Sequence, residues 1–345
     1  MNNMNSKINM KGLRFNTVLL VKELVKRGVQ IDMIQGTPFL RATFGDQVEI
    51  LDGDLSTQVP SVYYNIITNK FLTKMFLKKS KLPVVPGSMF SLNDPVNILN
   101  FCKNQIKFPV IIKPIDLASG DLVFTNINKE DELMDILKYF RLNIDQYNSK
   151  HPNNVLVEKH IDNVADFRFT VFEDGSIYGV KRQCPEVIGD GQLSIKALVE
   201  KINKTRVNPR KTCLNEIWLD DTHAQITLMK QNLTAESIPK KGQNVLIRHH
   251  SNICYGGSCD DITDDIHEDY KFILRKVLKL FPRMPFFGVD IFTKDISQKP
   301  TQGNYLINEL EVTPGFSLHL LPGTGKSRNI ISKAADILFP ETAKG

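Results

Sequence analysis

The chain has 345 residues, of which 41% are hydrophobic and 24% are charged. This length allows a substantial core and two or three subdomains, and the composition is typical of a globular protein. The net charge of +6 is modest and the lysines are scattered, so nucleic-acid binding is not expected without a basic stripe that carries interleaved aromatic residues.

The five cysteines form an odd set without a CxxC pair, which argues against a zinc site or a disulfide framework and favours a reducing compartment. The first nine residues are mostly polar, unlike a signal peptide, and no apolar run approaches the roughly 20 residues that span a bilayer. We therefore expect a cytoplasmic protein that does not associate with membranes.

The N-terminal segment predicts a small α/β subdomain over residues 1–66. Residues 14–27 have the pattern of an amphipathic helix that ends at Gly28, a favourable C′ residue. A strand over residues 29–33 follows, and Gly45-Asp46 is a hairpin signal between two further strands within residues 38–51.

The remaining residues, 67–345, predict a larger domain with a central lobe at about 80–160 and a C-terminal lobe at about 161–345. Helices and strands alternate here without the rhythm of a parallel sheet, which favours an α+β architecture over a doubly wound one. Residues 203–243 are polar and difficult to assign, and we expect helices and loops over a site. Helices are predicted at 69–79, 129–140, 266–280 and 328–338, and strands at 108–114, 154–159, 167–172, 177–182, 286–292 and 305–311.

Three carboxylates near the C-terminus suggest a metal site. Glu309 and Glu311 are two residues apart in a predicted strand and therefore project from the same face. Asp290 lies in another apolar strand. Mg²⁺ prefers such oxygen ligands and keeps substrate phosphates in its coordination shell. The alternative is the exposed polar face of an edge strand.

Several cations could bind the phosphates that such a metal accompanies. Lys113 ends a buried strand, where a lysine is costly unless it is paired, although an ordinary lysine at a strand end is equally consistent. Lys70 and Lys74 lie one helical turn apart. Ser119 and Gly120 could cover a phosphate, but a single glycine also serves any tight turn.

The segment Val155–Ile161 changes from apolar to polar and suits a hinge against which an adenine ring could lie. A strand that leaves the core is the alternative. Asp166 and Arg168 share one face of the next strand, and Lys181-Arg182 end its hairpin partner. These arginines could bind phosphate or carboxylate, or form a surface salt bridge.

Taken in order, these segments resemble those of an ATP-grasp ligase, with the closest similarity to the ATP-grasp domains of cyanophycin synthetase and bifunctional glutathione synthetases. The resemblance covers roughly residues 60–340. It rests on residues 108–114, 155–161, Val187 to Gly191, Arg248, Asn252 to Gly257, Asp290, and Asn308 to His319.

The resemblance implies a two-lobed α+β fold that grips ATP, with Mg²⁺ or alternatively Mn²⁺. It implies ATP contacts from Lys70, Lys113, Ser119, Gly120, the hinge residues Glu158, Lys159, His160 and Ile161, and Asp166 near the ribose. It implies metal ligation by Asp290, Glu309 and Glu311, and catalytic roles for Arg248, Lys181 and Arg182. It implies substrate contacts from Arg168, Asn252, Gly256, Gly257, Gly315 and His319.

Two residues depart from the family pattern. Glu311 stands where asparagine is usual, and Asp121 occupies the basic position of a loop that normally holds several glycines. A carboxylate there would repel a triphosphate. The second catalytic halves of both relatives are not found, so polymer elongation is not expected.

The resemblance implies a ligase that joins a small carboxylate and an amine, such as amino acids or peptides, through an acyl phosphate. A homodimer is compatible with it. A nucleotide-binding regulatory protein with little turnover and a small-molecule kinase are the alternatives.

Overall fold

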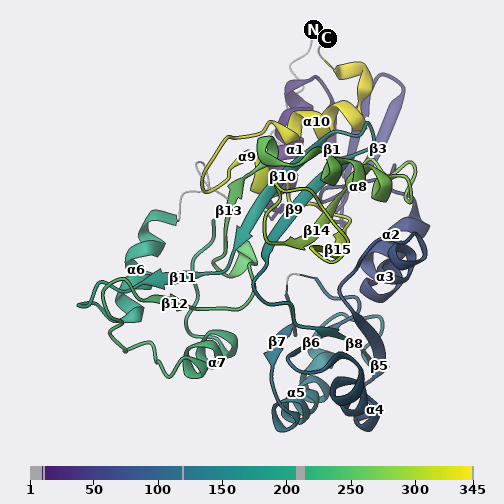
Figure 1. The fold of residues 1–345 in the computed structure, drawn as a ribbon. Helices are drawn as coiled ribbons and strands as arrows, with labels where there is room; N and C mark the ends of the chain where they lie inside the picture. The colour runs from purple at the N-terminus through teal and green to yellow at the C-terminus, as the bar shows by residue number, and fades with distance from the viewer. Residues whose placement is uncertain (1–9, 11, 119, 207–213, 344–345) are drawn as a thin grey trace.

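A computed structural model describes residue 10 and residues 12–118, 120–206 and 214–343 of the chain. The described strands form four sheets, and every ladder between neighbouring strands is antiparallel. Figure 1 shows an upper body around one sheet, a lower lobe around another, and an arm at the left. The predicted α+β class is confirmed.

The N-terminal unit is a helix that packs on a four-stranded sheet. The helix ends at Gly28, whose φ of +87° is the left-handed conformation that glycine adopts readily. Leu20 and Leu24 bury the inner face of this helix in a core shared with the last helix of the chain, so the unit is attached to the C-terminal lobe. Its elements are α1 (Phe15–Lys26), β1 (Gln30–Met33), β2 (Leu40–Phe44), β3 (Gln47–Asp52) and β4 (Leu55–Ser56).

The central lobe forms the lower part of Figure 1 and has a four-stranded sheet of order β5-β8-β6-β7. Two helices, α4 and α5, cover one face and share its apolar core. Before the sheet come α2 (Ser61–Thr68) and α3 (Lys70–Lys79). The lobe consists of β5 (Gly87–Ser91), α4 (Pro95–Phe101), η1 (Cys102–Ile106), β6 (Val110–Pro114), β7 (Phe124–Ile127), α5 (Glu130–Asn143), η2 (Ile144–Gln146) and β8 (Asn154–Lys159).

The C-terminal lobe is built on a five-stranded sheet of order β13-β10-β9-β14-β15. The aromatic and aliphatic side chains on one face of this sheet pack against α8, and this cluster forms its main core. Its elements are β9 (Ala165–Phe172), β10 (Ile177–Gln183), η3 (Ile253–Tyr255), β13 (Ser258–Asp261), η4 (Thr263–Asp265), α8 (Glu268–Leu278), β14 (Phe286–Thr293), β15 (Tyr305–Glu311), α9 (Phe316–Leu320), α10 (Ile330–Leu338) and η5 (Pro340–Thr342).

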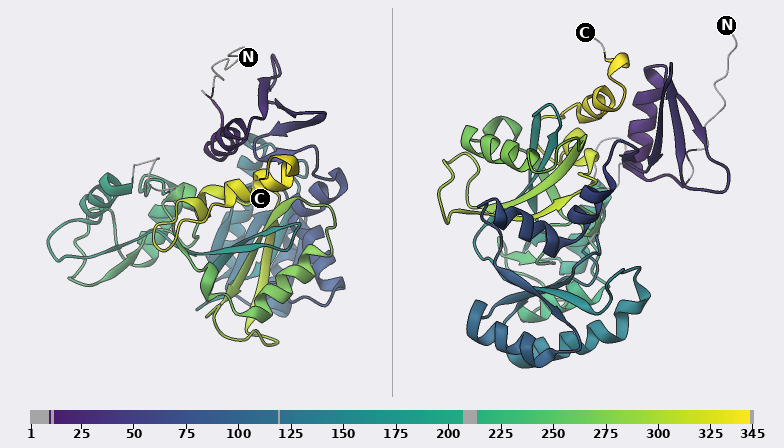
Figure 2. Two further views of the ribbon diagram at one scale, coloured as in Figure 1. Left: turned by 90° about the horizontal axis from the view of Figure 1, so that it is seen from above. Right: turned by 90° about the vertical axis from the view of Figure 1, so that its right-hand side faces the viewer.

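The arm is an excursion between β10 and β13 that has a small core of its own. It projects from the body in both Figure 1 and the left view of Figure 2. The right view of Figure 2 shows the N-terminal unit beside the C-terminal lobe. The arm contains β11 (Glu186–Ile188), α6 (Ile195–Arg206), α7 (Thr222–Lys230) and β12 (Asn244–Leu246).

The elements predicted from apolar periodicity occur with small shifts at their ends, and α7 of the arm lies within residues 203–243, where helices and loops were expected. Elements that were not predicted include α2, β5, α4, β7, β13 and α9. The three larger sheets lie within the ranges expected for the N-terminal subdomain and the two lobes, whose boundaries stay predictions. None of the helices within the described ranges is long and apolar enough to cross a membrane.

Candidate active site

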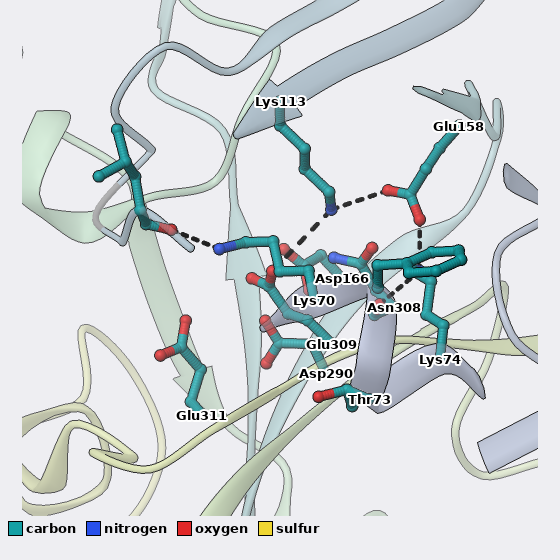
Figure 3. A network of polar contacts seen from close by, with 12 residues as sticks. Lys70, Thr73, Lys74, Lys113, Glu158, Asp166, Asp290, Asn308, Glu309 and Glu311 are labelled. Atoms are coloured by element: carbon teal, nitrogen blue, oxygen red, sulfur yellow. Dashed lines mark hydrogen bonds and ion pairs between the residues drawn. The ribbon is translucent and has the colours of Figure 1, made fainter. Parts of the chain in front are cut away.

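The predicted carboxylates lie together on the sheet of the C-terminal lobe. Asp290 on β14 stands opposite Glu309 on β15, and Gly288 stands opposite Glu311. The register shifts beside the first pair, and such a bulge increases the local twist of the sheet. Because opposed residues of an antiparallel pair share a face, the three carboxylates project from one side of the sheet, as Figure 3 shows.

Two arginines hold Asp290, which is fully buried. Arg168 on β9 binds both of its carboxylate oxygens, through Nε and through Nη2, the latter at 3.0 Å. Arg182 on β10 donates to the same carboxylate at 2.6 Å and also binds Asp166 at 2.9 Å. Burial alone would raise the pKa of Asp290, but the two guanidinium groups outweigh it and lower the pKa to about 2.

The other two carboxylates have free coordination capacity. Lys113 Nζ lies 3.9 Å from Glu309, and Arg168 Nη2 lies 3.7 Å from Glu311, both beyond hydrogen-bond length. Both glutamates are partly exposed, so this pair fits Mg²⁺, which commonly uses one or two carboxylates together with phosphate oxygens. The described part of the chain contains no preformed cluster of three potential ligands, and Asp290 is paired with two arginines. Its assignment as a ligand stays a prediction.

A buried ion-pair triad lies beside the carboxylates (Figure 3). Glu158 on β8 is fully buried and contacts Lys74 of α3 at 2.5 Å and Lys113 of β6 at 2.8 Å. Lys74 also donates to the carbonyl of Asn308 on β15 at 2.7 Å. The triad therefore connects the central lobe to the strand that carries Glu309.

A cleft of about 1840 Å³ separates these elements, which is larger than the 300–1,000 Å³ typical of a site for one small ligand. Many predicted site residues line it: Lys70, Lys113, Gly120, His160, Ile161, Asp166, Arg168, Lys181, Arg182, Asn252, Glu309, Glu311 and Gly315. The other described candidates do not: Glu158, Lys159, Arg248, Gly256, Gly257, Asp290 and His319. Ser119 lies outside the described residues.

Arg248 forms its ion pair with a carboxylate of the arm and not with those on the sheet of the C-terminal lobe. It is almost fully buried, forms an ion pair with Asp221 at the start of α7, and lies 4.4 Å above the ring of Tyr255. Burial lowers its pKa to about 10. Gly256 has a packing role, because a Cβ atom there would lie 2.6 Å from the Cα of Ile217. The catalytic role of Arg248 stays a prediction.

The loop between β6 and β7 contacts α3 on one side and the C-terminal lobe on the other. Lys70 donates to the carbonyl of Leu117 at the start of this loop. On the opposite side, the hydroxyl of Tyr255 donates to Asp121 at 3.4 Å. The carboxylate that departs from the family pattern therefore contacts a tyrosine of the C-terminal lobe.

Two other candidates have structural partners. Nε2 of His319, which is fully buried, lies 2.9 Å from the Thr170 hydroxyl, and burial lowers its pKa to about 3. Lys159 donates to the carbonyls of Lys107 and Phe108, each at 3.1 Å. Their predicted substrate and hinge contacts remain untested.

Sequence reasoning missed the contribution of the N-terminal unit, whose residues Arg14, Asn16, Asp52 and Asp54 also line the cleft. The segment Asp52-Gly53-Asp54 has the pattern of a simple hairpin turn. Nothing in that pattern indicates which way the turn faces.

No protein-family model matches the chain. The cyanophycin synthetase of Trichormus variabilis is 27% identical over 96% of this chain and 35% of its own length. The glutathione biosynthesis bifunctional protein of Clostridium perfringens is 27% identical over 97% of this chain and 42% of its own length. The chain thus spans about two fifths of these relatives.

Among solved structures, the crystal structure of a bifunctional glutathione synthetase from Pasteurella multocida has a TM-score of 0.63 and 26% identity. The similarity covers 96% of this chain and 44% of that one. It includes the N-terminal unit as well as the two lobes. The chain therefore has the ATP-grasp fold and is similar in sequence to cyanophycin synthetases and bifunctional glutathione synthetases.

Proposed function

We propose that the protein is an ATP-dependent carboxylate–amine ligase that joins amino acids or small peptides. The observation that carries this proposal is the arrangement of Lys113, Glu309 and Arg182 around one cleft large enough for a nucleotide and two small substrates. Sequence similarity to two kinds of synthetase that make amide products supports it.

In the proposed reaction, a substrate carboxylate oxygen attacks the γ-phosphorus of ATP, the bond to the β-phosphate oxygen breaks, and ADP leaves. The amine nitrogen of the second substrate then attacks the acyl carbon. The resulting tetrahedral intermediate expels inorganic phosphate, and the nitrogen loses a proton, so that an amide forms. The protein mainly contributes position and charge, because phosphoryl transfer requires little covalent work from it.

The cations of the cleft have distinct places in this scheme. Lys113 is the residue we assign to the phosphates, because it reaches the cleft while Glu158 fixes its ammonium group at 2.8 Å. Lys181 and Arg182 line the same cleft from β10, where they could neutralise charge on the acyl phosphate. Glu309 and Glu311 would hold Mg²⁺, which when bound neutralises phosphate charge.

The direct test is a screen of amino-acid pairs for ADP release in the presence of Mg²⁺. We expect ADP release to require both an acid and an amine, and hydroxylamine to trap the acyl phosphate as a hydroxamate. Release without an amine would instead indicate a kinase. Nucleotide binding without turnover of any pair would indicate a regulatory protein.

The matched variants are Glu309→Gln and Glu49→Gln. The first removes a carboxylate from the cleft, and we expect it to lose at least 100-fold in ADP release, consistent with about 3 kcal/mol of transition-state stabilisation. Glu49 lies in the N-terminal sheet, where its carboxylate accepts hydrogen bonds from Thr57 and Gln58, and it does not line the cleft. Equal activity of the two variants would contradict the metal assignment.

We also propose a cytoplasmic location. Cys102, Cys184 and Cys254 are free thiols in the described structure, as is usual in a reducing compartment. Fractionation of the cells that make the protein tests this location.

A further inference from the structure

The N-terminal unit places a buried carboxylate at the edge of the cleft. Asp54 follows Gly53 in the turn between β3 and β4 and is 5% exposed, yet it lines the cleft. The proposed phosphoryl transfer does not use it. Its position therefore calls for another explanation.

The partners of Asp54 leave its charge largely uncompensated. The hydroxyl of Thr17 donates to Oδ1 at 3.4 Å, which is a long bond. Burial raises the pKa of Asp54 to about 6, although hydrogen bonds from Thr17 and Asn16 and the charge of Arg14 oppose it. Among the described residues Asp54 has no salt-bridge partner, so its carboxyl group lines the cleft without a paired cation.

The turn that carries Asp54 is connected to the reaction centre. Asn16, at the start of α1, accepts a hydrogen bond of 2.9 Å from the backbone N–H of Ser317. Ser317 follows Gly315, which lines the cleft, and the carbonyl of the adjacent Pro314 accepts from Arg168 at 3.2 Å. A continuous path of contacts therefore links the N-terminal unit to the charged face of the sheet.

We propose that Asp54 binds a cationic group, an ammonium or guanidinium, of an amino-acid or peptide substrate. This inference rests on the proposed ligase function and adds the substrate class. The bound cation is not the reacting nitrogen, because the nucleophile must give up its proton. Leu55, Tyr64 and Leu318 line the same cleft and supply apolar surface for the body of the substrate.

The test is calorimetric titration of the whole protein loaded with Mg²⁺ and a non-hydrolysable ATP analogue. The probes are L-lysine, compared with norleucine and with Nα-acetyl-lysine, and glycylglycine, compared with its N-acetyl form. Each comparison removes one ammonium group, so the arms distinguish a side-chain cation from an α-ammonium.

We expect at least one cationic probe to bind more tightly than its neutral analogue, and Asp54→Asn to abolish that preference. The expected loss is roughly 10- to 150-fold in affinity, because hydrogen bonds to charged groups contribute about 1.5–3 kcal/mol. The control is Asp46→Asn, an exposed residue in the turn at the other end of β3, which should keep the preference.

The results separate this proposal from the proposed function. If the nucleotide analogue binds but no cationic probe is preferred, or if the preference survives in Asp54→Asn, the assignment of Asp54 is refuted and the ligase proposal stands. If the nucleotide analogue itself does not bind to the wild type, the ligase function fails first. Unchanged nucleotide affinity in Asp54→Asn shows that the variant is folded, and Asp54→Ser provides a second variant without charge.

Discussion

Replacement of Glu158 by glutamine removes the only negative charge of a buried triad. In the native structure this carboxylate contacts Lys74 at 2.5 Å and Lys113 at 2.8 Å, and all three residues are buried. Breaking a buried ion pair from one side costs about 3–5 kcal/mol, since the remaining charge is left without compensation. We expect Glu158→Gln to destabilise the central lobe by this amount.

The assay is urea unfolding followed by circular dichroism, together with hydrogen exchange of the amides in β6 and β8. A loss of about 3 kcal/mol corresponds to roughly 100-fold faster exchange through local opening. The double variant Glu158→Gln/Lys74→Met removes one uncompensated cation as well, and it should recover part of the loss, about 1–2 kcal/mol. A free energy of unfolding for Glu158→Gln within 0.5 kcal/mol of the wild-type value would refute the reasoning.

The pH dependence of stability gives an independent check on the same triad. Burial lowers the pKa of Lys74 from 10.5 to about 8, against the opposing charge of Glu158. Between these two values the unfolded chain binds more protons at this site than the folded chain does, so the contribution of Lys74 to stability rises with pH. The stability of the wild type relative to Lys74→Met should therefore increase from pH 8 to pH 10.5. If the stability difference between the wild type and Lys74→Met does not change over this pH range, Lys74 is not desolvated.

Three further variants probe the cleft. Tyr255→Phe removes the hydroxyl that donates to Asp121, and we expect a loss of about 0.5–1 kcal/mol of loop stability, measured as two- to five-fold faster limited proteolysis within residues 116–123. Asp290→Asn leaves the buried guanidinium group of Arg168 and the partly buried one of Arg182 without their shared anion, so urea unfolding should show a loss of about 3–5 kcal/mol. Glu311→Gln, on a partly exposed side chain, should change stability by less than 1 kcal/mol but reduce Mg²⁺-dependent ADP release, and unchanged release would contradict its assignment.

The charged face of the C-terminal sheet could be predicted from local sequence because strand alternation is a local property. Glu309 and Glu311 are two residues apart, and this spacing alone places them on one face. The pairing of Asp290 with Glu309 agrees with the expectation of neighbouring strands. The shift in register beside this pair could not be predicted from the sequence, because a bulge depends on the partner strand as well as on the strand that contains it.

The partners of Glu158 could not be predicted because they come from distant parts of the chain. Lys74 lies on a helix 84 residues earlier, and nothing in either segment specifies their contact. The resemblance placed Glu158 in an adenine hinge, which stays a prediction. In the structure its side chain is fully buried and contacts Lys74 and Lys113. The arm had no strong periodicity either, since its small core is assembled from several short elements.

Asp121 shows how a departure from a family pattern depends on its neighbours. Considered alone, a carboxylate in a phosphate-covering loop argues against closure over ATP. In the structure the hydroxyl of Tyr255 donates to it, and the guanidinium of Arg248 lies 4.4 Å from the centre of that tyrosine ring. The C-terminal lobe thus provides a hydrogen-bond donor for the loop. Because the loop is held by a contact between lobes, its position is coupled to the width of the cleft. The carboxylate that favoured a protein without turnover therefore has a hydrogen-bond partner that the loop sequence does not contain.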